Sequence, residues 1–196
     1  GVLVALMRGF DPVVCMEAIV RDRLTVFVGL SLMYQAILDH PRRREFDLSN
    51  LRTCIYTMAP MGRPLLERAM ADMCPNFVLS SGQTEMYPAT TMSQPDRQLE
   101  RFGNYWGESL IVNETAIMDD NGNLLPRGQV GELVHRGPNV MMGYYKDPKA
   151  TEEARKYGWH HTGDLALIDE HGEVLFLDRK KDMIKSGGEN VASVKI

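Results

Sequence analysis

One cluster of polar residues carries the groups that handle phosphate and metal. It is Ser81-Gly82-Gln83-Thr84-Glu85. A glycine permits close approach of the backbone to a ligand, the Thr84 hydroxyl is suited to phosphate, and the Glu85 carboxylate is suited to Mg²⁺. The same string is also typical of an ordinary loop before a helix, in which Ser81 or Thr84 caps the helix. These residues alone leave both interpretations open.

A second cluster, Gly158-Trp-His-His-Thr-Gly-Asp164, offers a carboxylate directly after a Thr-Gly turn. Such a carboxylate accepts hydrogen bonds from both hydroxyls of a ribose, although an aspartate in this place also stabilises turns. His160 and His161 are adjacent, so in a strand they point to opposite faces and cannot bind one metal ion together. We therefore assign them no metal role.

A third cluster runs from Asp178 to Asn190 and is basic at its start and glycine-rich at its centre. The Arg179 guanidinium has the donors to reach a ribose or a phosphate. Gly187-Gly188 allows backbone conformations that are closed to other residues. We expect this segment to be a hinge that leads into a further domain.

The elements that would position these clusters change in kind along the chain. Up to about residue 93, helical and strand patterns alternate, which predicts a parallel sheet with right-handed crossovers. The predicted helices begin at Asp11-Pro12, at Ser31 (to Asp39) and at Pro64 (to Met73), and the predicted strands are 24–30, 53–57 and 77–80. Ligands bind beyond the carboxyl ends of strands in such sheets, which is where Ser81 to Glu85 would lie.

From about residue 101, short strands are separated by hairpin-turn compositions. The predicted strands are 115–118, 130–135, 165–168 and 174–177, with one helix opened by Asp147-Pro148 and running to about Lys156. The predicted fold class is α/β, a partial doubly wound parallel sheet followed by a small antiparallel sheet or barrel. The predicted domains are 1–100, 101–178 and 179–196, the last holding the hinge and the start of a lid domain.

Composition excludes several classes of protein. The net charge is −4, with 22 basic residues dispersed among 26 acidic ones, so nothing favours binding to nucleic acid or to an anionic membrane. Cys15, Cys54 and Cys74 form no CxxC pair and are expected to be buried, reduced thiols. No apolar run approaches the length of a membrane helix. We expect a cytoplasmic protein.

The three clusters, in this order, resemble the adenylate-forming superfamily of acyl-CoA synthetases, peptide-synthetase adenylation domains and luciferases. The resemblance extends over nearly the whole chain. It also includes Gly128-Gln-Val-Gly-Glu-Leu133 and Gly137-Pro-Asn-Val-Met-Met-Gly-Tyr-Tyr145. Together these motifs favour the functional interpretation over the capping and turn alternatives for Glu85, Asp164 and Arg179.

The resemblance implies a role for each matching residue. Thr84 would contact the α-phosphate, Glu85 would help to hold Mg²⁺, and Asp164 would bind the ribose hydroxyls with help from Arg179. Lys181 matches the hinge about which a C-terminal lid rotates. The remaining expected contacts, to the adenine and acyl pockets, the nucleotide and the pantetheine tunnel, come from Met58, Ala59, Pro60, Ser81, Gly82, Gln83, Ser186, Gly187 and Gly188.

Two departures from the family pattern stand beside these matches. Ser81 occupies the position where the family commonly has an aromatic residue that stacks on adenine, and such stacking is worth about 1–3 kcal/mol. Tyr56-Thr57 stands where paired glycines are common. Adenine binding is therefore expected to be weaker or to rely on Tyr56 or Met58.

The implied parent enzyme is an ATP-dependent, AMP-forming ligase that joins a fatty, medium-chain or aryl carboxylic acid to CoA, with Mg²⁺ as cofactor. The family's phosphate loop would precede Gly1 and its catalytic lysine would follow Ile196. We thus expect a fragment that is inactive alone. A non-catalytic AMP-binding module and a peptide-synthetase-type adenylation domain are the alternatives.

Overall fold

The computed structural model describes residues 1–57, 61–181, 184–186 and 189–191, with the backbone alone for the last two segments. The chain forms two compact units that interleave in sequence. The first unit comprises residues 1–79 and 94–103, and the second comprises residues 80–93 and 104–196. The predicted division at residues 100 and 178 stays a prediction.

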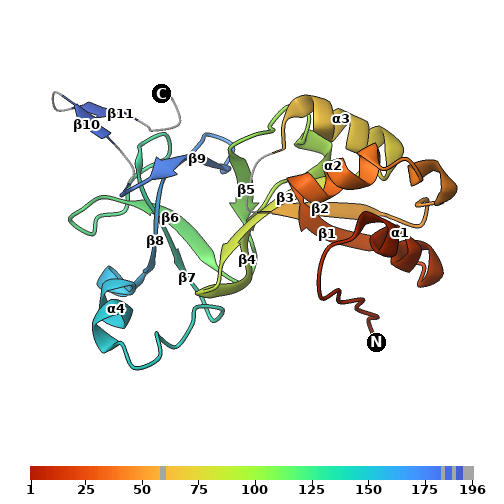
Figure 1. The fold of residues 1–196 in the computed structure, drawn as a ribbon. Coiled ribbons are helices and arrows are strands. Elements are labelled where there is room, and N and C mark those ends of the chain that lie inside the picture. Colours follow the sequence, from red (N-terminus) through yellow and green to blue (C-terminus); the bar gives the residue numbers. More distant parts are fainter. Residues whose placement is uncertain (58–60, 182–183, 187–188, 192–196) are drawn as a thin grey trace. The chain divides into compact units, whose positions relative to one another are not determined.

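The first unit alternates helices with strands (Figure 1). In chain order its elements are α1 (Pro12–Arg21), β1 (Val26–Leu30), α2 (Ser31–Asp39), η1 (Arg43–Glu45), β2 (Thr53–Thr57), α3 (Arg63–Asp72), the start of β3 (Phe77–Gln83) and η2 (Pro95–Arg97). The strands β1 and β2 pair in parallel, with Val26 opposite Thr53 and Leu30 opposite Thr57. Parallel strands joined through a helix are the crossover arrangement that the sequence predicts.

The helices of this unit begin where the sequence signals predict. Asp11 caps α1 by accepting hydrogen bonds from the backbone N–H groups of Val13 and Val14, and Pro12 occupies the first turn. Proline costs nothing there because the first N–H groups of a helix have no partner within the helix. The predicted helix at 31–39 and the predicted strand at 53–57 match α2 and β2 residue for residue.

The core of the first unit is built around fully buried aromatic rings. The Tyr34 ring packs edge-on against Phe27 and Phe77 with centroids 5.1 Å apart in both pairs. Its hydroxyl donates to the carbonyl oxygens of Phe27 and Ile55, so the buried O–H is satisfied. The three cysteines are buried and free, as the sequence predicts.

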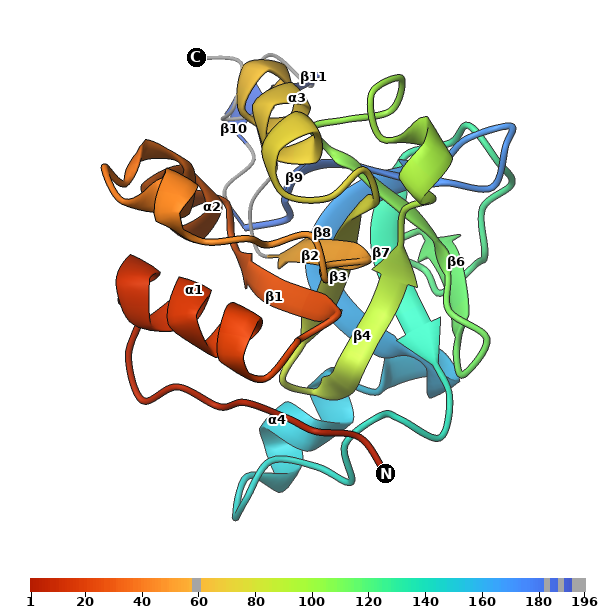
Figure 2. The same ribbon diagram turned by 90° about the vertical axis from the view of Figure 1, so that its right-hand side faces the viewer.

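The second unit is an antiparallel sheet (Figure 2). It contains the end of β3, then β4 (Met86–Met92), β5 (Tyr105–Ser109), β6 (Glu114–Met118), β7 (Gly131–Arg136), α4 (Pro148–Glu153), η3 (Lys156–Gly158), β8 (His160–Ile168), β9 (Val174–Arg179), β10 (Ile184–Ser186) and β11 (Glu189–Val191). The strand order is β3-β4-β5-β9-β8-β7-β6, and β10 pairs with β11 alone. A buried cluster of Ile117, Leu133, Ala166 and Val174 holds β6 to β9 together.

The α/β fold class is confirmed, and four strands were not predicted, namely β4, β5, β10 and β11. The alternative interpretation of residues 81–85, a loop that leads into a capped helix, is wrong, because β3 continues to Gln83 and a tight turn at Thr84-Glu85 leads directly into β4. β4 contains a proline, Pro88, which argues against a strand when the sequence is considered alone. Across the described residues, no helix combines the length and apolar character needed to cross a membrane.

Gly107 on β5 offers a test of how β4 and β5 are held. It has a φ of +83°, and a Cβ there would overlap the carbonyl oxygen of Met92. Gly103 has a φ of +78° but nothing near the same position. We expect Gly103→Ala to show only the backbone strain of about 1–3 kcal/mol. Gly107→Ala should cost more, because strand β4 must also move.

Urea denaturation of both variants measures this difference. An equal decrease in the free energy of unfolding in the two variants would contradict the close approach of β4 at Gly107.

Candidate functional site

The turn Thr162-Gly163-Asp164 bulges out of strand β8. Between the pairs Glu132–Leu165 and Val134–His161 the chain advances four positions along β8 but only two along β7. Gly163 has a φ of +74°, a conformation that side chains rarely adopt. The Thr162 hydroxyl fixes the bulge by donating to the Leu133 carbonyl oxygen at 2.7 Å and accepting from the Asp164 N–H at 3.0 Å.

Asp164 is a buried carboxylate with one oxygen not hydrogen-bonded. Its relative exposure is 3%. Arg179, which pairs with it across β8 and β9, places Nε 3.0 Å from Asp164 Oδ1 as an ion pair. Among the described residues, however, no donor makes a hydrogen bond to that oxygen. Burial raises the pKa of Asp164, and the charge of Arg179 offsets only part of this effect.

Gln83 connects the first and second sequence clusters. Its amide nitrogen donates to the Thr162 carbonyl oxygen at 3.1 Å and to Asp164 Oδ2 at 3.4 Å. The amide oxygen therefore faces His160 Nε2 at 2.9 Å, and the imidazole must donate through that nitrogen. Burial lowers the pKa of His160, which favours the neutral ring, with its hydrogen on Nε2.

The two histidines have separate partners, as expected for neighbours in a strand. His161 Nδ1 lies 3.1 Å from Glu132 Oε2, and its Nε2 lies 3.1 Å from the Lys156 carbonyl oxygen. Within the described ranges, no group of three or more His, Cys, Asp or Glu side chains is placed to hold a metal ion. A Mg²⁺ ion at Glu85 would thus depend on water and substrate phosphates for its other ligands, which is how Mg²⁺ is often bound.

Glu85 lies in the turn between β3 and β4 and is oriented by a tyrosine that sequence reasoning did not single out. The Tyr144 hydroxyl donates to Glu85 Oε1 at 2.9 Å. The Met141 N–H donates to the Glu85 carbonyl oxygen at 2.7 Å. Both residues come from the motif at 137–145 that supports the family resemblance, so the signal was present but the role was not.

Ser81 and Gly82 serve the β3–β4 hairpin. The Ser81 hydroxyl lies 2.6 Å from Thr91 Oγ1 on the opposite strand. A Cβ on Gly82 would lie 3.0 Å from the Ala89 Cα, so close strand approach is a sufficient reason for the glycine. Tyr56, suggested as a substitute for the missing aromatic ring, is fully buried in the first unit and donates its hydroxyl to Gln98 Oε1 at 2.8 Å. It therefore presents no face for stacking on adenine.

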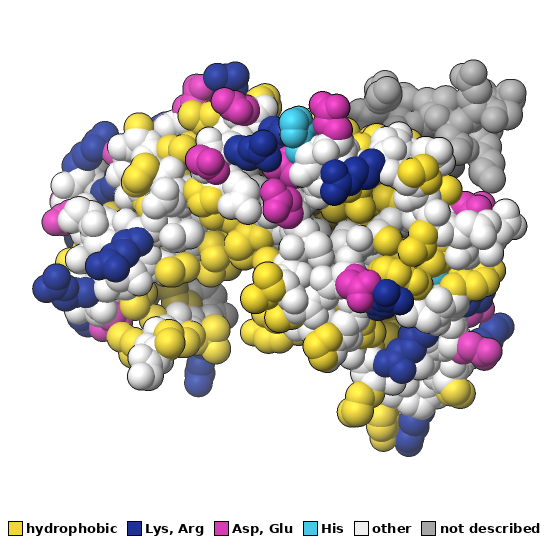
Figure 3. Space-filling model, turned by 180° about the vertical axis from the view of Figure 1, so that it is seen from behind, with side chains coloured by type: hydrophobic (Ala, Val, Ile, Leu, Met, Phe, Trp, Pro, Cys, Tyr) yellow, Lys and Arg dark blue, Asp and Glu magenta, His cyan; other side chains and the backbone are white. Residues whose placement is uncertain are grey.

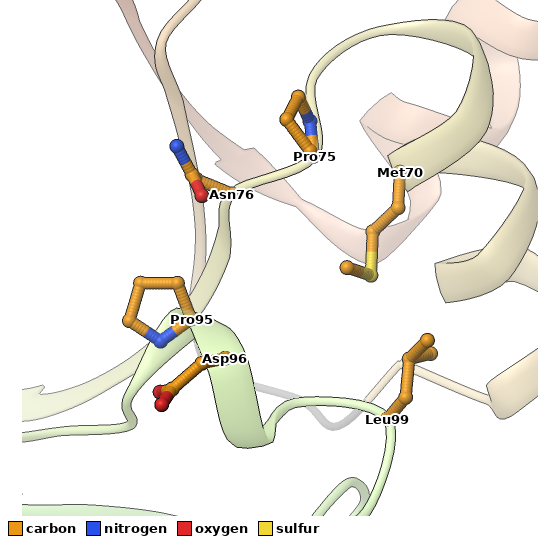
Figure 4. A pocket seen from close by; sticks show the side chains of 6 residues that line it. All are labelled: Met70, Pro75, Asn76, Pro95, Asp96 and Leu99. Carbon is orange, nitrogen blue, oxygen red and sulfur yellow. The ribbon is translucent and has the colours of Figure 1, made fainter.

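A hollow of about 460 Å³ adjoins the Thr-Gly-Asp turn and is lined by Thr162, Gly163, Arg179, Lys180 and Lys181. Its cationic side chains suit an anionic ligand. A hollow of about 360 Å³ in the first unit is lined mostly by apolar side chains and includes none of the predicted site residues (Figure 4). On the face that Figure 3 shows, basic and acidic side chains are interspersed, in keeping with the dispersed charge of the sequence.

Gln83, Asp164 and Arg179 thus come together around one turn, and Glu85 lies with Tyr144. Thr84 lies in the same turn as Glu85, and Lys181 is exposed just after β9. Other predicted contacts fall outside the described residues, namely Met58, Ala59, Pro60, Gly187 and Gly188. Ser186 is placed in β10 by its backbone only.

Comparison with known proteins identifies the family of this chain. A family model described as AMP-binding enzyme matches residues 1–145. The chain belongs to this family. The matched residues of this chain include both the β3–β4 hairpin and the motif at 137–145 that contributes Tyr144.

Individual relatives are named as CoA synthases and ligases. A feruloyl-CoA synthase from Amycolatopsis sp is 38% identical over 196 residues, which is 100% of this chain and 40% of the relative. The medium/long-chain-fatty-acid–CoA ligase FadD8 of Mycobacterium tuberculosis is 34% identical over 192 residues, covering 97% of this chain and 33% of the relative. The chain therefore spans less than half the length of these relatives.

Solved structures share the fold. O-succinylbenzoate coenzyme A synthetase (MenE) from Bacillus subtilis, in complex with ATP and a magnesium ion, superimposes with a TM-score of 0.84 at 28% identity. The match covers 95% of this chain and 38% of that one.

The buried carboxyl group of Asp164 gives a pH-dependent prediction. Because its pKa is raised in the folded protein, the folded state binds the proton more tightly than the unfolded chain. The free energy of unfolding then falls as the pH rises from about 4, the ordinary pKa of an aspartate, through the raised pKa of Asp164. Asp164→Asn removes this loss, so its Tm relative to the unmodified protein should increase between pH 4 and pH 7.

Asp119→Asn is the matched control, because hydrogen bonds, first from the Asn123 side chain, lower the pKa of Asp119. Because that pKa lies below the ordinary aspartate value, the relative Tm of Asp119→Asn should be nearly constant between pH 4 and pH 7 and should change only below about pH 4. Thermal denaturation at several pH values measures both variants. A relative Tm of Asp164→Asn that decreases with pH would show that the carboxylate is stabilised, not penalised, by its surroundings.

Proposed function

We propose that this chain forms part of the nucleotide site of an ATP-dependent, AMP-forming ligase that joins a carboxylic acid to CoA. One observation carries the proposal. Asp164 Oδ1 is buried, forms an ion pair with Arg179 and accepts no hydrogen bond from the described residues, and it lies next to a cationic hollow. A buried acceptor of this kind is costly unless a ligand supplies the donors. The two hydroxyls of a ribose are suitable donors, and the chain belongs to a family named for AMP binding.

Each residue then has a proposed task in binding. Asp164 accepts from the ribose hydroxyls, and Arg179, with its side chain half exposed, reaches the ribose or phosphate. Thr84 donates to the α-phosphate, and Glu85 contributes a carboxylate to Mg²⁺. The Mg²⁺ ion, when bound, neutralises charge on the phosphates.

The proposed reaction has two steps and consumes no oxidant. An oxygen of the acid attacks the α-phosphorus of ATP, and pyrophosphate leaves, giving acyl-AMP. The thiol sulfur of CoA then attacks the acyl carbon, its proton is lost, and AMP leaves. Positioning and charge stabilisation carry such steps. In this proposal Lys181 is the hinge between them, and Ser186, Gly187 and Gly188 border the path of the pantetheine thiol.

We take fatty, medium-chain and aryl acids as the substrate classes, in line with the names of the relatives. Ser81 provides no ring for stacking on adenine, so the ribose contacts carry a larger share of the affinity. A panel of these acids in the pyrophosphate-exchange reaction of the whole enzyme identifies the class.

The binding of AMP is the direct test. Calorimetry should show AMP binding to the protein, and Asp164→Ala should weaken it by about ten- to a hundredfold, because hydrogen bonds to a charged acceptor are worth about 1.5–3 kcal/mol. Glu153→Ala removes an exposed carboxylate from α4 and is the matched control. An AMP affinity that is equal in all three proteins would mean that Asp164 only stabilises its turn.

Tyr144 gives a second test through the metal. Tyr144→Phe removes the donor that orients Glu85, so the Mg²⁺ concentration needed for half-maximal ATP binding should rise about two- to tenfold. Tyr145→Phe alters the neighbouring tyrosine, which is 87% exposed, and should leave it unchanged. If the required Mg²⁺ concentration rises equally in both variants, Tyr144 has no specific role in orienting Glu85.

A further inference from the structure

The carboxylate of Glu132, on β7, has polar partners in three directions. Its Oε1 accepts from the Gly163 N–H at 3.1 Å. Its Oε2 accepts from Lys180 Nζ at 2.9 Å and lies 3.1 Å from His161 Nδ1. A single carboxylate thus joins β7, the bulged turn of β8 and the residue that follows β9.

The Glu132 side chain is 9% exposed, so its carboxylate is removed from most solvent. Burial raises its pKa, but the hydrogen bonds and charges of Lys180 and His161 together outweigh burial, and the pKa of Glu132 is lowered overall. The charged form is therefore the one that the surroundings favour. A buried charge held in this way is strongly destabilised when one partner is removed.

The bulge in β8 explains why a carboxylate is useful at this place. Where the register shifts, Gly163 loses its position in the β7–β8 ladder, and its N–H bonds to the Glu132 side chain. The carbonyl oxygen of Gly163 accepts from the Lys180 N–H at 2.8 Å. Both backbone groups of Gly163 are therefore fastened, one through Glu132 and the other through Lys180.

Lys180 contacts both Glu132, through its side chain, and Gly163, through its backbone N–H. Its ammonium group also lies 2.8 Å from Asp120 Oδ1, but the Asp120 side chain is 83% exposed and that pair is screened by solvent. The pair with buried Glu132 is the stronger constraint. Lys180 stands directly between Arg179 and Lys181, so its position affects the residues on either side.

We propose that Glu132 is a positioning residue that couples the Thr162-Gly163-Asp164 turn to Lys180, and so aligns Asp164 and Arg179 for the nucleotide. The inference rests on the proposed function for its ligand. Its geometry involves Gly163 and Lys180 and does not require a bound nucleotide.

Two variants separate the parts of this coupling. Glu132→Gln keeps an acceptor for the Gly163 N–H but directs an amide donor at Lys180 and His161. Lys180→Met removes only the cation and keeps most of the length of the side chain. Each should weaken AMP binding about tenfold, and the double variant should lose much less than the product of the two, since residues in one ion pair are coupled.

Rescue and control variants exclude a merely structural effect. Lys180→Arg should restore AMP binding to within about twofold of the unmodified protein, because the guanidinium can still reach the carboxylate. Asp120→Asn should leave the affinity unchanged. Losses that multiply in the double variant, or a loss in Asp120→Asn as large as in Lys180→Met, would overturn the proposal.

A ligand-free measurement distinguishes failure of this inference from failure of the proposed function. The Gly163 amide should exchange its hydrogen slowly in the unmodified protein and much faster in Glu132→Leu, which has no acceptor. If the protein binds no AMP but Gly163 behaves in this way, the proposed function fails and the positioning role of Glu132 stands. If exchange at Gly163 is unchanged in Glu132→Leu, the positioning role is wrong.

Discussion

The bulge in β8 is the constraint on which the candidate site depends. Two extra residues on β8 lift Thr162-Gly163-Asp164 out of its ladder with β7 and free their polar groups on that side for other partners. In a regular strand these groups would form hydrogen bonds with the neighbouring strands. The hydroxyl of Thr162, the amide of Gln83 and the carboxylate of Glu132 take the places of the missing ladder bonds. The antiparallel sheet around them supplies rigid strands from which these side chains reach the turn.

Two buried carboxylates on neighbouring strands illustrate how environment separates structural from binding groups. Donors surround both oxygens of Glu132, and its pKa is lowered. One oxygen of Asp164 accepts no hydrogen bond within the part of the chain that the structure describes, and the pKa of Asp164 is raised. The second arrangement lowers the stability of the protein, because burial of a carboxylate that is only partly hydrogen-bonded is destabilising, and the charge of Arg179 offsets only part of that cost. Proteins retain such groups where a ligand completes them, which is the role proposed for Asp164.

Local signals were enough to predict the first unit and insufficient for parts of the second. Asp11 caps α1 as predicted, and the strand at Thr53–Thr57 follows from a short apolar run; both signals act within a few residues. The range 31–39 is also helical, but Ser31 is its first residue and not its cap, because the N-cap is Leu30 and makes no side-chain hydrogen bond. β4 and β5 depend instead on partners distant in sequence, and Pro88 hides the first of them. The site shows the same division. Asp164 and Glu85 are recognisable from motifs, whereas Tyr144 and Glu132 gain their roles from contacts with residues 59 and 31 positions away.

Ser81 stands where an aromatic residue is common in the family that the sequence resembles, and its role in the structure is in strand pairing. In the structure its hydroxyl closes the β3–β4 hairpin against Thr91, so the position contributes to strand pairing and offers no ring. Stacking on a base is worth about 1–3 kcal/mol, and a site without it must obtain affinity from polar contacts. In the proposed site those contacts would come from Asp164 and Arg179, which are aligned across β8 and β9. A nucleotide site of this composition would be unusually sensitive to the geometry of the bulge, and therefore to the residues that fasten Gly163.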